Sequence, residues 1–113
     1  MLSKSSRLQK TKDIKRVFQI GRATKEGFLI LKALPNNSNQ NRFAFIVSQK
    51  LSKKANLRNK VKRRLRELVR LKENKIKKGQ DIVIIAVPGL EKKDFWEIEE
   101  TIDKLFEKAK IKL

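Results

Sequence analysis

The sequence predicts a small α+β protein, a two-layer α/β sandwich in which helices pack on a sheet of three or four strands. In three segments, apolar residues recur at spacings of three and four, the period of an amphipathic helix. Three other segments are rich in β-branched and aromatic residues, as strands are. The predicted order is α-β-β-α-β-α, and a length of 113 residues suits a single domain spanning 1–113.

The N-terminal part predicts a basic tail followed by a short helix. Residues 1–10 show no periodicity, so we expect them to be flexible or loosely ordered. Thr11 suits an N-cap, and the helix should end before Gly21. Its apolar face is formed by Ile14, Val17 and Phe18. Residues 22–25 are predicted to add a short edge strand.

Two strands are predicted at 28–34 and 42–48, separated by a polar loop at 35–41 that should be mobile. Because they follow one another closely, we expect them to form an antiparallel pair. The run 81–87 is continuously apolar and bounded by turn residues, which is typical of a central strand buried on both faces.

The last helix is predicted to begin after Asp94, because Asp94 and Glu97 have the spacing of a capping box. Its core stripe is formed by Phe95, Ile98, Ile102, Leu105, Phe106 and Ala109. Trp96 lies beside this stripe, and packing is favoured for it over stacking on a base. Core positions are also expected for Phe43 and Phe45.

Positive charge is concentrated in two segments. The chain has 30 Lys and Arg against 12 Asp and Glu, a net charge of +18. Residues 50–72 hold 11 of the basic residues and one acid, and residues 1–25 hold eight basic residues and one acid. The rest is nearly neutral, which indicates an organised surface for a polyanion.

The segment 55–72 predicts a helix with two distinct faces. Its apolar face is formed by Leu57, Val61, Leu65, Leu68 and Val69, and the opposite face by Asn59, Arg63, Arg66 and Arg70, with Lys62 at its edge. A solvated face would be balanced by acids at i±4, but only Glu67 is available, to pair with Arg63. Arginine forks match phosphate geometry, so nucleic-acid binding is favoured over a solubility role.

Composition excludes several kinds of chemistry. Without cysteine or histidine there is no thiolate nucleophile, no disulfide and no histidine base or metal ligand. The carboxylates of the last helix alternate with lysines, which favours a polar outer face over a metal site; they are Glu97, Glu100, Asp103 and Glu107. No apolar run is long enough to span a membrane, so we expect a cytoplasmic protein.

The pattern Ala55-x-x-Arg58-Asn59-x-x-Lys62-Arg63-x-x-Arg66, preceded by Ser48-Gln-Lys-Leu-Ser52, resembles the signature of the bacterial ribonuclease P protein subunit. Lys60 replaces the second arginine of the family's Arg-Asn-Arg motif, and Gln49 stands where lysine is common. Arg7-Leu8 and Ile14-x-x-x-Phe18-x-x-Gly21 also resemble the family, although Ile14 replaces an aromatic residue. The resemblance covers 7–106.

This resemblance implies a fold shared with a ribosomal-protein domain. It also implies a left-handed crossover through helix 55–72, whereas ordinary chirality between parallel strands would be right-handed. In this family a catalytic RNA with its Mg²⁺ ions removes the 5′ leader of precursor transfer RNA, and the protein assists by binding both RNAs. The chain alone should be inactive, with no obligate protein partner and no membrane association.

Two groups of site residues follow from the resemblance. Contacts with the catalytic RNA are expected from Lys50, Arg58, Asn59, Lys60, Lys62, Arg63, Arg66 and Arg70. Contacts with the leader are expected from Arg7, Ile14, Lys15, Phe18 and, on the strand facing the first helix, Leu31. Periodicity alone leaves Phe18 open between core packing and base stacking. A ribosomal protein and a DNA-architectural protein remain alternative functions.

Overall fold

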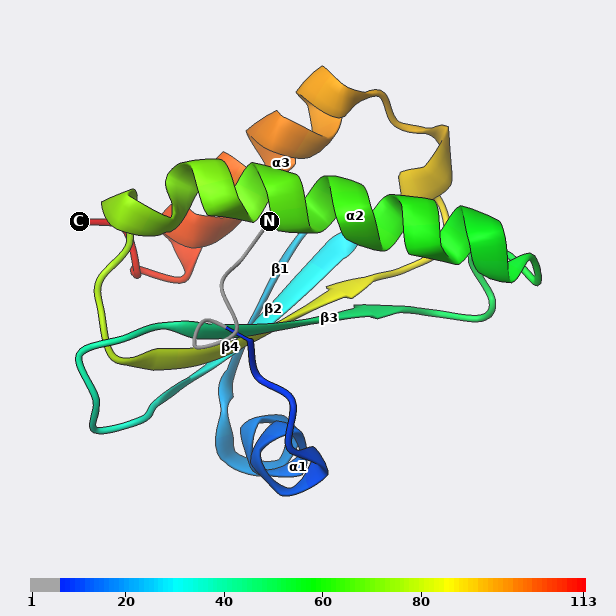
Figure 1. The fold of residues 1–113 in the computed structure, drawn as a ribbon. Coiled ribbons are helices and arrows are strands. Elements are labelled where there is room, and N and C mark those ends of the chain that lie inside the picture. The colour runs from blue at the N-terminus through cyan, green and yellow to red at the C-terminus, as the bar shows by residue number, and fades with distance from the viewer. Residues whose placement is uncertain (1–6) are drawn as a thin grey trace.

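The computed structural model describes residues 7–113 and confirms the α+β class (Figure 1). Its elements are α1 (Thr11–Ile20), β1 (Arg22–Glu26), β2 (Leu29–Pro35), β3 (Arg42–Val47), α2 (Ala55–Lys72), β4 (Gln80–Ala86) and α3 (Phe95–Lys108), with single 3-10 turns η2 (Glu73–Lys75) and η3 (Leu90–Lys92). No helix in the described range is both long and apolar enough to cross a membrane.

The four strands form one mixed sheet in the order β1-β2-β4-β3. The expected antiparallel pair of β2 with β3 is wrong, because β4 lies between them, antiparallel to β2 and parallel to β3. As the most continuously apolar strand, β4 takes the central position, where both of its faces are covered. The long helix α2 is therefore the crossover between parallel neighbours, and its left-handed sense stays a prediction.

Helices cover both faces of the sheet (Figure 1). On one face, alternate strand residues such as Ile82 and Ile84 pack with α2 and α3 in the main core. On the other face, Val83 packs with Val17 of α1 and with Leu8 in a smaller cluster. The sheet with α2 and α3 is the predicted sandwich, and α1 adds a further layer of one helix.

The capping box of α3 is present as predicted. The Asp94 carboxylate accepts a hydrogen bond from the Glu97 N–H at 2.8 Å, and the Glu97 carboxylate accepts one from the Asp94 N–H at 3.4 Å. The predicted core stripe is also buried, except at its first residue, Phe95. The sequence therefore fixes where α3 begins and which of its faces is covered.

The segment before α1 is held to the sheet at residues 7–10, while the rest of the predicted flexible tail lies outside the described residues. Arg7 forms a parallel bridge with Phe43 at the edge of β3. The Leu8 N–H donates to the Phe43 carbonyl at 2.7 Å, and the Leu8 side chain is buried. This pairing brings the basic N-terminal segment alongside β3.

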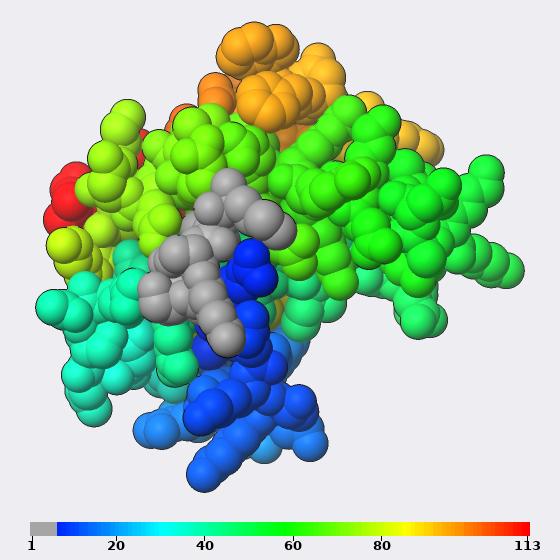
Figure 2. All heavy atoms as spheres, in the orientation of Figure 1, coloured from blue at the N-terminus to red at the C-terminus, as the bar shows by residue number. Residues whose placement is uncertain are grey.

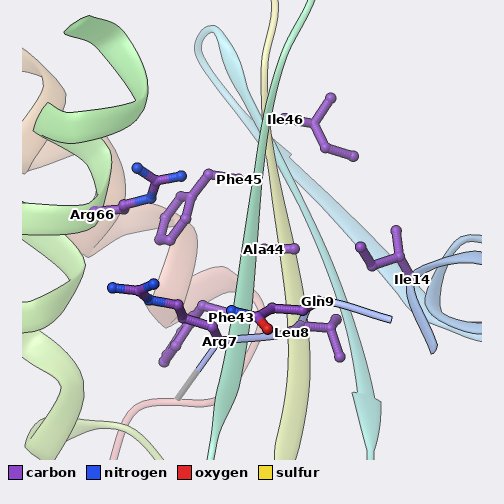
Figure 3. Close-up of a pocket in the computed structure, with 9 residues that line it drawn as sticks. All are labelled: Arg7, Leu8, Gln9, Ile14, Phe43, Ala44, Phe45, Ile46 and Arg66. Carbon is purple, nitrogen blue, oxygen red and sulfur yellow. The ribbon is translucent and has the colours of Figure 1, made fainter. Parts of the chain in front are cut away.

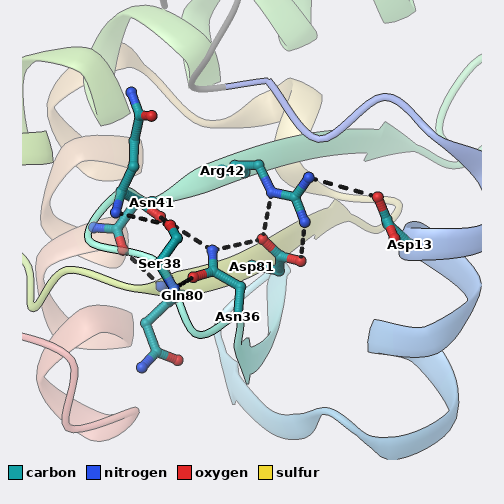
Figure 4. A network of polar contacts seen from close by, with 8 residues as sticks. Asp13, Asn36, Ser38, Asn41, Arg42, Gln80 and Asp81 are labelled. Atoms are coloured by element: carbon teal, nitrogen blue, oxygen red, sulfur yellow. Dashed lines mark hydrogen bonds and ion pairs between the residues drawn. The ribbon is translucent and has the colours of Figure 1, made fainter.

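A polar network ties α1 and the loop before β3 to the sheet (Figure 4). Arg42 donates two hydrogen bonds to Asp81, at 2.8 and 2.6 Å, and its third nitrogen lies 3.5 Å from Asp13 of α1. These hydrogen bonds from Asp81 raise the pKa of Arg42 above its ordinary value. Asn36 donates to Asp81 at 2.9 Å, and Asn41 accepts from the Gln80 N–H at 2.9 Å. The loop expected to be mobile is thus held at both ends.

Candidate nucleic-acid interface

The two faces of α2 are arranged as predicted. Its apolar side chains Val61, Leu65, Leu68 and Val69 are buried in the main core. The opposite side carries the predicted polar residues: Asn59, Lys60, Arg63 and Arg70 are exposed, and Arg58, Lys62 and Arg66 are partly exposed. Lys50, in the turn before the helix, is exposed as well. A core on one side thus holds a cationic surface in place on the other.

Arg58 has a structural contact in addition to its predicted role. One guanidinium nitrogen donates to the Ser52 carbonyl at 2.8 Å, which ties the helix back to the turn that precedes it. In the same turn, the Ser48 hydroxyl accepts from the Lys50 N–H at 3.1 Å. These two bonds hold the start of α2 and the turn carrying Lys50 in one arrangement.

The expected pair of Glu67 with Arg63 is wrong, because Glu67 pairs with Arg70 instead, at 2.6 Å. Positions i and i+3 are also neighbours on a helix, and the guanidinium fork of Arg70 reaches both carboxylate oxygens. Hydrogen bonding to Arg70 lowers the pKa of Glu67, and the same contact raises that of Arg70. Arg70 is thus already partly neutralised by its own helix.

Most of the helix's charge has no internal counterion. Lys72 pairs with α3, at 2.9 Å from Asp103. Within residues 7–113 no acidic side chain forms an ion pair with the remaining cations of α2, which are Arg58, Lys60, Lys62, Arg63, Arg64 and Arg66. Six neighbouring unpaired cations repel one another, so a polyanion bound there gains attraction and relieves repulsion.

A groove of about 280 Å³ passes over the edge of β3 and connects the two faces of the sheet (Figure 3). On one side Arg66 of α2 lies beside Phe45, and on the other Ile14 of α1 lies beside Ile46. Arg7 lines the same groove. The cationic face of α2 and the face covered by α1 are therefore parts of one continuous surface.

Phe18 lies on α1 outside the core, with 37% of its surface exposed. The Lys32 ammonium sits 4.7 Å from the centre of its ring and donates to the Phe18 carbonyl at 3.3 Å. A cation over one ring face holds the aromatic side chain in a defined orientation. Nearby, Ile14 is partly buried and Lys15 is exposed. The structure thus gives this face an accessible aromatic ring beside positive charge.

The expectation that Leu31 faces α1 is wrong. Leu31 is 0% exposed and packs in the main core, on the α2 and α3 side of the sheet. Successive strand residues point to opposite faces, so the residue of β2 that reaches Phe18 is Lys32. Sequence reasoning missed Lys32, although a lysine inside an apolar strand marks the side that stays open to solvent.

The acids of α3 are engaged by lysines rather than gathered around a metal position. Glu97 pairs with Lys93 at 3.6 Å, and Glu100 pairs with Lys104 at 3.2 Å. Among residues 7–113, no group of three acidic side chains lies close enough to hold a metal ion. We therefore derive no step through a protein-bound metal. The expected packing of Trp96 is wrong, because 72% of its surface is exposed.

A family model described as Ribonuclease P matches residues 2–110 of the chain. The chain is 35% identical over 109 residues to the ribonuclease P protein component of Caldanaerobacter subterraneus subsp. tengcongensis, covering 96% of this chain and 93% of that protein. It is 36% identical over 110 residues to the corresponding protein of Alkaliphilus metalliredigens, covering 97% and 98%.

Solved structures agree with the sequence comparison. The RNase P protein of Staphylococcus aureus superposes with a TM-score of 0.88 at 26% identity, covering 97% of this chain and all of that one. The RNase P protein of Thermotoga maritima gives a TM-score of 0.81 at 31% identity, covering 88% and 94%. From the α2 motif, the two-sided sheet and these similarities together, we conclude that the chain belongs to the ribonuclease P protein family.

Proposed function

We propose that two faces of this chain divide its work in the ribonuclease P holoenzyme: the basic face of α2 binds the RNA subunit, and the α1 face of the sheet holds the substrate leader. Members of the family act with that RNA subunit to remove the 5′ leader of precursor transfer RNA. The assignment of each partner to a face is inferred from charge, exposure and motif register.

The observation that carries the first assignment is the set of six unpaired cations on α2, because four of them occupy the register of the family motif: Arg58, Lys62, Arg63 and Arg66. RNA backbone contacts need cations that are free to leave water for a phosphate. Lys60 supplies charge without a planar fork, and Arg70 contributes least because Glu67 already holds it. Asn59 and Lys50 extend the same surface.

The second assignment rests on the α1 face. Single-stranded RNA is held by aromatic rings beside positive charge, and Phe18 with Lys32 supplies both. Ile14, Lys15 and Arg7 border the same region. Lys32 takes the place proposed from sequence for Leu31 and brings a charge where an apolar contact was expected. Leader affinity should therefore depend on salt as well as on stacking.

Catalysis is assigned to the RNA subunit and its Mg²⁺ ions, in the cytoplasm. The chain has no histidine or cysteine to act as base or nucleophile. One of the similar structures is of a Staphylococcus aureus RNase P protein mutant described as defective in mRNA degradation activity. Assays of the isolated chain should therefore use an mRNA as well as a precursor transfer RNA.

The proposal is tested by the salt dependence of RNA-subunit binding. Arg63→Ala with Arg66→Ala should lower the slope of log affinity against log salt by about two, close to one per phosphate contact. Lys77→Ala with Lys112→Ala removes the same charge from exposed sites away from α2 and should change the slope less. Equal slopes in the two double variants would show that α2 makes no specific phosphate contacts.

A further inference from the structure

Trp96 is a large exposed aromatic residue that neither of the two assigned faces uses. It is the only tryptophan of the chain, and 72% of its surface is exposed. Phe95 lies beside it with its ring edge-on, at 5.6 Å between centroids and an interplanar angle of 88°. Phe95 is itself 37% exposed, so the pair presents an aromatic surface at the first turn of α3. An indole left in water at this scale indicates a contact with another molecule.

The side of α2 that faces this turn is cationic. Lys60 and Arg64 line a small hollow together with Leu90 and Ile98, and Ile98 lies two residues after Trp96 on the same helix. Figure 2 shows the first turn of α3, in orange, beside the middle of α2, in green, on the same face of the molecule. Lys60 and Arg64 are among the cations without an acidic partner in the described residues. The aromatic surface therefore continues the unpaired charge of α2.

The acids around Trp96 are already occupied. Glu97 pairs with Lys93 and Glu100 with Lys104, as described above. Glu91, which lines the hollow, accepts from the Gly89 N–H with both carboxylate oxygens, at 2.9 and 3.2 Å. Glu99 lies 3.9 Å from the Lys72 ammonium. With these carboxylates engaged, the free charge nearest to the indole is positive.

We propose that Trp96 is a stacking platform for an unpaired base of the RNA subunit, at the end of the interface formed by α2. An exposed indole binds a base through its flat face, and Lys60 and Arg64 would neutralise the phosphates on either side. The charge complementarity favours RNA over a protein partner, for which unpaired cations beside an aromatic surface offer less. The inference rests on the proposed binding of the RNA subunit to α2.

Because Trp96 is the only tryptophan, its fluorescence reports on this site without labelling. We titrate the full chain with a bacterial ribonuclease P RNA and follow quenching by acrylamide, while filter binding measures complex formation independently. Stacking should change the emission and protect the indole from acrylamide in proportion to the complex formed. An indole that stays accessible when filter binding shows saturation overturns the proposal and is the outcome expected of a site for a protein partner.

Variants at the same position separate stacking from other contacts. Trp96→Ala should weaken RNA-subunit binding by about five- to 150-fold, the range for one lost base stack, with an unchanged melting temperature because the side chain is exposed. Trp96→Phe should restore most of the affinity, whereas Trp96→Leu, which keeps apolar bulk without a ring, should not.

The α2 double variant Arg63→Ala with Arg66→Ala keeps the two proposals distinguishable. If it weakens RNA binding while Trp96→Ala has no effect, α2 binds RNA and the stacking platform is wrong. If neither change affects binding, the interface on α2 is wrong as well. Equal affinities for the Phe and Leu variants also contradict stacking, because only one of them keeps an aromatic face.

Discussion

Replacing Phe18 with alanine tests most sharply whether the α1 face serves the substrate. The ring is 37% exposed and lies under the Lys32 ammonium, so it is available on one side and held on the other. If a leader base stacks on this ring, its removal weakens the holoenzyme's grip on precursor transfer RNA. Mature transfer RNA has no leader, so its binding should be unchanged.

The structure sets the expected size of each effect. Loss of one base stack is worth about 1–3 kcal/mol, or about five- to 150-fold in affinity. Truncating a fully buried phenylalanine costs about 3–5 kcal/mol of stability, and the partial exposure of Phe18 places its loss well below that range. The contact with Lys32 adds about 0.5–1 kcal/mol. The freed Lys32 can still attract a phosphate, which favours the lower half of the affinity range.

The assay measures holoenzyme affinity for precursor and for mature transfer RNA, and the melting temperature, on one preparation. Val17→Ala is the matched control, because Val17 lies on the same helix and is fully buried against the sheet. It should destabilise the protein and leave the ratio of the two affinities unchanged. A Phe18→Ala protein that behaves in the same way, destabilised with an unchanged ratio, would refute a leader site at this residue.

Three further changes have defined outcomes. Asn59→Ala should raise the Mg²⁺ concentration needed for cleavage and leave the precursor-to-mature ratio intact, because its proposed partner is the RNA subunit; a changed ratio in the titration would contradict this. Asp81→Asn should lower the free energy of unfolding by about 1–3 kcal/mol in urea, since Arg42 loses a charged acceptor but is partly exposed; an unchanged midpoint would show that this pair adds nothing. Arg70→Ala should weaken RNA binding less than Arg63→Ala does, because an ion pair already neutralises Arg70; the reverse order in filter binding would place the interface nearer the end of α2.

The helices were predictable from sequence because their signals are local. The 3.6-residue period of α2 separates Leu65 from Arg66 onto different sides, and no distant contact is needed to see it. The capping box of α3 likewise lies within four residues. The same locality made the basic surface of α2 visible before its surroundings were known.

Strand neighbours and strand faces were not predictable in the same way. Alternation shows that Leu31 and Lys32 point to opposite sides, but only the packed sheet shows which side meets α1. The pairing of β2 with β4 depends on which strand is covered on both faces, a property of the whole fold. A short connection between β2 and β3 suggested a hairpin that the burial of β4 overrides.

The charged and aromatic surface residues failed for a different reason. Glu67 has basic neighbours on both sides of α2, and side-chain geometry selects Arg70 over Arg63. Trp96 follows an apolar stripe closely enough to suggest packing, yet the start of α3 leaves it in solvent. In both cases the residue type was informative, but its contact depended on an angle that sequence does not contain.

The central claim is that this chain makes a catalytic RNA competent and does no cleavage itself. Its most direct test is reconstitution with a bacterial ribonuclease P RNA at limiting Mg²⁺, following release of the leader from precursor transfer RNA. We predict that the chain accelerates cleavage at the mature 5′ end, that Arg63→Ala with Arg66→Ala loses most of this effect, and that the chain without RNA leaves the precursor intact. Cleavage by RNA-free protein that survives controls for contaminating nucleases, or no acceleration by the chain at any concentration, would contradict the claim.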